Sequence, residues 1–339
     1  MGGSRGRPSL VVRSKSESVF VLAFDLRVDR IVAAAIGLGG EVLAHIQRPR
    51  SDGPYPVEKA IATILDETDE LFEALPTGAL WAGVGIAVPG VVETELGFVR
   101  KAPNLGWIDL PFWELIHGAI KEHIGVCPRV VLGNDANLGA IAEYVRGAAT
   151  AASSVVYLSG DVGVGGGVVL GGQVLAGGSG YAGELGHLVV NPHGQPCACG
   201  SKGCWETEVG RDAILGAAGF NLGQDSFPEL LVAAKNDPEG MAVKLTEVGE
   251  WVGVGLVNLM NSIDPNYIVL GGHLAEIYPY IDKVVERRIS QSRPNMETRA
   301  NISLPSLPLD SPLVGAAEMA FGPLLLDPLQ HVEQIYSLV

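Results

Sequence analysis

The chain has 339 residues, of which 47% are hydrophobic and 18% charged, and its formal net charge is −15. This composition excludes a disordered polypeptide, and the length indicates about two domains at roughly 150 residues each. A surface this acidic repels nucleic acid over most of its area. The apolar runs are short and interrupted by Gly, Pro or charge, so we expect no membrane span and a cytoplasmic location.

The chain opens with a basic segment and continues as an alternation of strands and helices. Residues 1–16 hold four basic residues and no acid, which predicts a flexible lead-in. Three strands are then predicted at 19–24, 31–36 and 42–46, with a glycine-rich turn before the last of them. The rest of this first unit is predicted as a helix at 57–75, a strand at 82–88, a helix at 111–124, a strand at 130–132 and a helix at 136–145.

A similar order begins again near Ser154. Its predicted elements are strands at 155–158, 167–170 and 173–175, a helical region that includes 242–261, a strand at 267–270, a helix at 275–288, a strand at 301–304 and a helix at 313–325. Two such units predict two α/β domains with partly parallel sheets. We expect an N-terminal domain of residues 17–145 plus about 310–330, and a C-terminal domain of residues 146–309.

The second unit is interrupted by a cysteine-rich segment. Cys197, Cys199 and Cys204 fall within eight positions, and His187 lies ten residues upstream of the first. Three thiolates and one imidazole complete a tetrahedral Zn²⁺ site, which would be structural because no coordination position stays open. The alternative is three buried free thiols and a surface histidine, but three cysteines in so short a glycine-rich run are hard to place in a core. Such a zinc site would hold the two glutamates that bracket it, which are Glu184 and Glu206.

Three other segments have both a functional and a structural interpretation. Asn134 and Asp135 follow a predicted strand, where a carboxylate could act as a general base, although a helix cap is the better local interpretation. The glycines of 160–167 could let backbone amides approach a phosphate, but a tight hairpin is more typical of this segment alone. Asn104, in a Pro/Gly loop beside Trp107, suits sugar recognition or an ordinary ordered turn.

Together these motifs resemble the ROK family of repressors, open reading frames and kinases, from about Gly6 to Leu325. The most specific matches are Gly-Glu-Leu-Gly-His at 183–187 and Cys-Ala-Cys-Gly-Ser-Lys-Gly-Cys-Trp-Glu at 197–206. The resemblance implies an actin-like ATPase (duplicated ribonuclease H-like) fold, in which two α/β domains surround a sugar cleft and carry a zinc-binding insertion. It implies zinc on His187, Cys197, Cys199 and Cys204, and a homodimer or tetramer. It also implies that a sugar is bound by Asn104, Asn134, Asp135, Glu184, His187 and Glu206.

The family contains ATP-dependent sugar kinases and sugar-responsive repressors, and its kinases carry an Asp-x-Gly-Gly-Thr-type phosphate turn after the first strand. Here residues 25–29 read Asp-Leu-Arg-Val-Asp, so both glycines are absent and Asp29 replaces the hydroxyl residue. A carboxylate about 4 Å from an ATP phosphate repels it by roughly 1–4 kcal/mol per charge pair. Val162 also stands where the kinases usually have threonine. These changes resemble the repressor branch, which includes the N-acetylglucosamine and xylose repressors.

The sequence therefore predicts a sugar-sensing regulator domain with structural zinc, a hexose or amino-sugar effector and no kinase activity. Gly6-Arg7-Pro8 resembles the segment that follows a repressor's winged helix-turn-helix, so we expect DNA binding only through a domain missing from this chain. The alternative is an ATP-dependent sugar kinase, of the glucokinase or N-acetylhexosamine kinase type, that uses ATP and Mg²⁺ with Asp135 as base. A third hypothesis is a zinc-stabilised scaffold without a ligand, which the polar residues predicted for the cleft disfavour.

Overall fold

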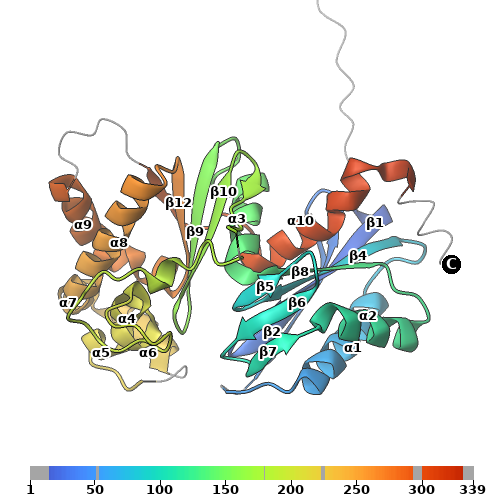
Figure 1. Cartoon of the computed structure of the whole chain (residues 1–339), viewed down its shortest axis with the longest axis horizontal. Coiled ribbons are helices and arrows are strands. Elements are labelled where there is room, and N and C mark those ends of the chain that lie inside the picture. Colours follow the sequence, from blue (N-terminus) through green and yellow to red (C-terminus); the bar gives the residue numbers. More distant parts are fainter. Residues whose placement is uncertain (1–14, 51–52, 179, 223–225, 293–299, 331–339) are drawn as a thin grey trace, which may run out of the picture.

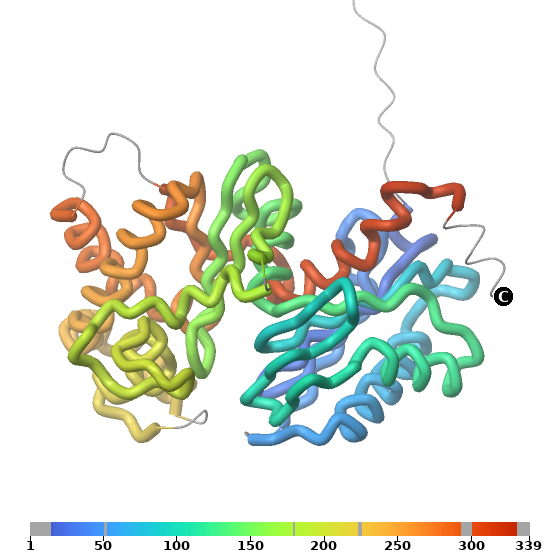
Figure 2. The backbone as a smooth tube through the Cα atoms, in the orientation of Figure 1, coloured from blue at the N-terminus to red at the C-terminus, as the bar shows by residue number. Residues whose placement is uncertain are grey.

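The computed structural model describes residues 15–50, 53–178, 180–222, 226–292 and 300–330. The predicted lead-in lies outside the described residues except for Lys15 and Ser16, where a short 3₁₀ turn (Ser16–Ser18) begins. The chain forms two lobes, each built on a five-stranded sheet (Figures 1 and 2). No helix among the described residues is long and apolar enough to cross a membrane.

The first sheet has the strand order β3-β2-β1-β4-β8. Strands β1, β4 and β8 are mutually parallel, whereas β2 and β3 are antiparallel to their neighbours. The strands span β1 (Val19–Leu26), β2 (Arg30–Gly37), β3 (Val42–Pro49), β4 (Leu80–Val88) and β8 (Arg129–Asn134). Because the carboxyl ends of the parallel strands meet at one edge, the residues that follow them gather there.

Strand β1 is almost entirely buried because both faces of the first sheet are covered. Its alternate residues enter different cores: Phe20, Leu22 and Phe24 pack with the first, and Val21 and Ala23 pack with the second. The first core includes helices α1 (Val57–Glu73) and α2 (Phe112–Ile124), and the second includes helix α10 (Ser311–Leu326).

The second sheet repeats the same arrangement in the order β11-β10-β9-β12-β13. Its strands are β9 (Ser154–Gly160), β10 (Val164–Leu170), β11 (Gln173–Val174), β12 (Tyr267–Gly272) and β13 (Asn301–Ser303). One face is covered by α4 (Trp205–Val209), α5 (Arg211–Ala218), α6 (Ser226–Asn236), α7 (Pro238–Lys244), α8 (Thr246–Ser262) and α9 (His273–Ser292).

Helices α3 (Asp135–Val145) and α10 form the layer between the two sheets (Figure 1). Alanines of α3 pack against β9 and β10, whereas α10 packs on β1 and β4. Glycines permit the close approach: a methyl group at Gly85 would lie 2.0 Å from the Ala316 carbonyl oxygen, and one at Gly315 would lie 1.9 Å from that of Leu138. The packing of α3 against α10 therefore joins the two lobes.

A small third sheet lies on the side of the first lobe that faces the second lobe (Figure 1). It consists of β5 (Val91–Glu93), β6 (Phe98–Ala102) and β7 (Trp107–Leu110). This sheet and helices α4 to α6 were not predicted from the sequence. The helical region predicted to include 242–261 is confirmed, and it comprises two helices, because the backbone leaves the helical conformation at Leu245 and separates α7 from α8.

Candidate functional site

The cysteine-rich segment folds into a compact knuckle in the second lobe. The Sγ atoms of Cys199 and Cys204 lie 3.6 Å apart, and Cys197 Sγ lies 3.6 Å from His187 Nδ1. All four ligand atoms lie within 4.8 Å of one another. The knuckle requires glycine at position 203, whose φ is +70° and whose Cβ would meet the Asn191 carbonyl oxygen.

This donor set fits zinc. In a tetrahedral site with Zn–S bonds of about 2.3 Å, neighbouring ligand atoms are separated by about 3.8 Å. The two measured separations of 3.6 Å agree with that spacing.

Both predicted glutamates lie beside this knuckle. His187 Nε2 is 3.6 Å from Glu184 Oε2, and His187 Nδ1 is 3.3 Å from Glu206 Oε1. Glu206 is carried by the first turn of α4, which is anchored by the fully buried Trp205. The Trp205 indole N–H donates to the Trp251 carbonyl oxygen at 2.9 Å, so the direction of Glu206 is fixed by the core.

The sequence allowed two roles for Asn134 and Asp135, a helix cap and a general base. Asn134 is the N-cap of α3, because its side-chain oxygen accepts the Asn137 N–H at 2.9 Å. Asp135 begins the helix, and its Oδ1 accepts from the Ala136 N–H at 2.8 Å. Burial, reinforced by the charge of Asp25 and opposed by the Ala136 N–H, raises the pKa of Asp135 to about 7. The cap interpretation thus holds for Asn134 and leaves Asp135 available for chemistry.

The glycine-rich segment 160–167 forms the β9–β10 hairpin, and its glycines make room for the side chains of the site. A methyl group at Gly163 would lie 2.4 Å from Glu206 Oε2, and one at Gly165 would lie 3.2 Å from the Ala136 Cβ. Two residues of extended chain span at most about 7 Å. Glu206 and the start of the helix that carries Asp135 therefore flank neighbouring positions of one hairpin.

The Asn104 loop is a turn, which is one of the two interpretations that its sequence allows. Asn104 is exposed in the turn between β6 and β7, and no hydrogen bond or ion pair among the described residues joins it to the other predicted site residues. Trp107 is only 5% exposed and donates its indole N–H to the Tyr55 carbonyl oxygen at 2.6 Å. Trp107 therefore belongs to the core of the first lobe, which agrees with the ordered-turn interpretation of this loop.

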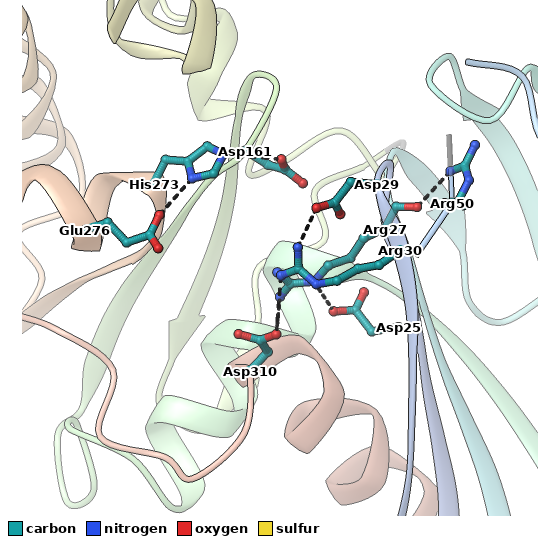
Figure 3. Close-up of polar contacts among 9 residues, drawn as sticks. All are labelled: Asp25, Arg27, Asp29, Arg30, Arg50, Asp161, His273, Glu276 and Asp310. Atoms are coloured by element: carbon teal, nitrogen blue, oxygen red, sulfur yellow. Dashed lines mark hydrogen bonds and ion pairs between the residues drawn. The ribbon is translucent and has the colours of Figure 1, made fainter. Parts of the chain in front are cut away.

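The turn that follows β1 is held by a backbone hydrogen bond and by the ion pairs of Arg27 (Figure 3). The backbone N–H of Arg27 donates to the Arg30 carbonyl oxygen at 3.0 Å, and this bond forms a hairpin turn between β1 and β2. The Arg27 Nε lies 2.7 Å from Oδ2 of Asp25, a carboxyl that is 1% exposed. Burial raises the pKa of Asp25, and the Arg27 charge opposes that effect.

Two groups near this turn were missed by sequence reasoning. Asp310 lies just before α10 and is 3.2 Å from Arg27 Nη2. Asp161, at the end of β9, faces the turn from the second lobe beside His273 (Figure 3), and His273 Nε2 is 3.9 Å from Asp161 Oδ1. No local pattern could identify Asp310, because only the fold brings it to Arg27.

The comparisons with known proteins agree with this architecture. The model of the ROK family matches residues 21–322. The chain is 27% identical to the xylose repressor of Bacillus subtilis (strain 168), over 84% of this chain and 72% of the repressor. It is 28% identical to a glucokinase of Streptomyces coelicolor, over 91% of this chain and 98% of that enzyme.

Among solved structures, the ROK hexokinase from Thermus thermophilus superposes with a TM-score of 0.71 at 28% identity, over 90% of this chain and 99% of that one. Similar proteins thus include repressors as well as kinases. Because the family match covers most of its length, the chain belongs to the ROK family, and it has the actin-like α/β fold of that family's sugar kinases and repressors.

Proposed function

We propose that this chain is a sugar-binding regulator domain that does not phosphorylate its sugar. The observation that carries the proposal is the turn after β1, where ATP phosphates would have to approach the backbone. The Arg27 guanidinium lies there between the carboxylates of Asp25 and Asp310, and the Arg27 N–H is bonded within the turn. The backbone amide of Arg27 and two nitrogens of its guanidinium are thus already engaged within the protein.

Charge around this turn supports the same conclusion. Three carboxylates, those of Asp25, Asp29 and Asp310, surround the two guanidinium groups of Arg27 and Arg30. A carboxylate about 4 Å from a phosphate oxygen repels it by roughly 1–4 kcal/mol, and its arginine partner offsets part of that repulsion. The guanidinium groups are thus paired with carboxylates, and a triphosphate would meet these ion pairs in place of a cradle of amides.

Sugar binding is supported by the groups that converge near the β9–β10 hairpin. Glu184, His187 and Glu206 lie together at the knuckle, while Asn134 and Asp135 lie at the start of α3. Carboxylates, amides and an imidazole are the donors and acceptors that sugar hydroxyls require. We include Asn104 as a sugar ligand supplied from the first lobe, on the family resemblance alone.

We assign structural zinc to His187, Cys197, Cys199 and Cys204. When bound, the ion would cross-link four positions of the loop, and its binding free energy would add to the free energy of folding. His187 would then hold a fixed orientation between Glu184 and Glu206, which are 3.6 and 3.3 Å from its ring nitrogens. The knuckle would position the sugar ligands without taking part in a reaction.

A sugar kinase is the second candidate, and Asp135 is the observation that favours it. A carboxyl whose pKa is raised to about 7 has the proton affinity that a general base needs near neutral pH. The 28% identity to a glucokinase from Streptomyces coelicolor is consistent with this alternative.

One assay distinguishes the two candidates. The zinc-loaded protein is incubated with ATP, Mg²⁺ and a panel of hexoses, pentoses and N-acetylhexosamines, and sugar phosphate is measured directly. We expect none above the level given by Asp135→Asn, together with saturable heats of sugar binding that Glu184→Ala removes. Sugar phosphate formation that Asp135→Asn abolishes would establish the kinase, and the absence of any sugar binding would favour a scaffold.

A further inference from the structure

Two cysteines of the knuckle lie close together but differ in their access to solvent. Cys199 is exposed, whereas Cys204 is 0% exposed, and their Sγ atoms lie 3.6 Å apart. A cysteine that binds a metal is a thiolate, which is the form of the side chain that attacks an oxidant. An accessible thiolate beside a second cysteine is the arrangement typical of cysteines that are reversibly oxidised.

The surroundings of the other two cysteines favour a bridge between Cys199 and Cys204. Cys197 is 8% exposed, so an oxidant reaches it less easily, and its Sγ is already engaged by the Cys199 backbone N–H at 3.4 Å and by Glu206 Oε1 at 2.9 Å. Cys127 lies in the first lobe, after α2, and its Sγ donates to a backbone carbonyl oxygen. The exposed sulfur and its buried neighbour are therefore the pair best placed to react.

The backbone beside Cys199 permits the two sulfurs to meet. A disulfide bond is about 2.05 Å long, so the sulfurs must approach each other by about 1.6 Å. Cys204 is the N-cap residue of α4 and is held in the core of the second lobe. Gly200 has a φ of +92°, and a methyl group there would meet nothing within 4 Å. The exposed side of the knuckle thus has room to move toward Cys204.

We propose that Cys199 and Cys204 form a peroxide-sensitive switch that releases the zinc and weakens sugar binding; the effect on sugar rests on the proposed function. The Cys199 thiolate attacks one oxygen of hydrogen peroxide, the O–O bond breaks, hydroxide leaves, and a sulfenic acid forms. The Cys204 thiolate then attacks that sulfur, the S–O bond breaks, and a second hydroxide leaves. The two thiolates lose two electrons to the peroxide, and two protons convert the hydroxide ions to water.

Formation of the bridge would disturb three of the proposed sugar ligands together. His187 and Cys197 are the zinc ligands that remain, which is too few for a structural site. His187 would lose the metal that orients it between Glu184 and Glu206. Cys197 would take up a proton and could then donate to Glu206 Oε1, which lies 2.9 Å from its Sγ. The oxidised knuckle would thus turn these polar groups away from a sugar.

The test treats the zinc-loaded full chain with hydrogen peroxide. A colorimetric chelator measures the released zinc, and mass spectrometry of the digested protein locates the disulfide. We expect zinc release and thiol loss to proceed together, a bridge between Cys199 and Cys204, and reversal by dithiothreitol with added zinc. Cys127→Ser is the matched control and should release zinc as fast as wild type. Cys199→His keeps a zinc-binding side chain without a thiol, so it should retain its zinc under the same treatment.

The switch would be overturned by zinc that stays bound in treated wild type, by a bridge that uses Cys197, or by equally fast zinc loss from Cys199→His. Calorimetric sugar titration before and after oxidation measures the consequence. Sugar affinity should fall about tenfold or more, as on loss of one charged hydrogen bond, and unchanged affinity would overturn the regulatory role. If the untreated protein binds no sugar, the proposed function fails, while zinc release and the position of the disulfide still decide the switch.

Discussion

Replacing Asp135 with asparagine should stabilise the protein at about pH 8 and change its stability little at about pH 4. Burial raises the pKa of this carboxyl from 3.8 to about 7 in the folded state. Between those values the folded protein retains a proton that the unfolded chain releases, so wild-type stability falls as the pH rises from about 4 to about 7. Asparagine does not titrate, so this loss is absent from the variant.

The size of the effect follows from the shift in pKa. About three pKa units correspond to a ceiling of roughly 4 kcal/mol at about 1.4 kcal/mol per unit. Asp135 is only half-buried and its charge is coupled to that of Asp25, so we expect about 1–2 kcal/mol. The Asn134 cap and the bond from the Ala136 N–H do not require the negative charge and should persist.

Urea denaturation of both proteins at several values between about pH 4 and pH 8, with zinc held constant, measures this difference. Asp212→Asn, which removes a 56%-exposed carboxylate beside Arg211, serves as the matched control and should show no such trend. The reasoning is refuted if Asp135→Asn is less stable than wild type at the alkaline end, or if the difference between them does not grow with pH.

Three further predictions follow from the described contacts. Cys199→Ser should lower bound zinc, measured by metal analysis, and the melting temperature together, and unchanged zinc would exclude Cys199 as a ligand. Gly167→Ala should cost about 1–3 kcal/mol in urea denaturation, because its methyl group would lie 2.1 Å from the Ala136 carbonyl oxygen. Gly216→Ala on α5, with nothing within 4 Å, is its control and should be neutral or stabilising. Glu67→Gln should stabilise the protein by roughly 2–3 kcal/mol at about pH 8 and not at about pH 4. The reason is that burial raises the pKa of Glu67 from 4.5 to about 7 in the folded state. Equal changes in the free energy of unfolding at both pH values would contradict this prediction.

The strands of the two five-stranded sheets and the helices of the first lobe could be predicted because their signals are local. The apolar run at the start of β1 is continuous since helices cover both faces of the sheet, and the α1 range is off by two residues at its end only. The four ligand atoms of the knuckle could also be predicted, since they come from residues 187–204 of one continuous segment. The break between α7 and α8 at Leu245 involves no proline or glycine, so the hydrophobic periodicity of the sequence did not indicate it.

Contacts between distant segments could not be predicted in the same way. Trp107 packs on Phe112 in the core, and its indole N–H donates to the Tyr55 carbonyl, 52 residues away, a contact that no local pattern indicates. The sequence indicated that the phosphate turn was altered, but Asp310, which holds Arg27, lies on another element altogether. The glycines of 160–167 were correctly interpreted as a hairpin, although their contacts with Glu206 and Ala136 needed the fold.

The most direct test of the account is a pair of calorimetric titrations on the zinc-loaded protein. The first adds sugars from the panel, and the second adds a non-hydrolysable ATP analogue with Mg²⁺ to protein saturated with the sugar that binds best. We expect saturable sugar binding and no saturable heat from the nucleotide, because the ion pairs of Arg27, Asp29 and Asp310 fill the turn where we propose that its phosphates would approach. Stoichiometric binding of the nucleotide analogue would contradict it.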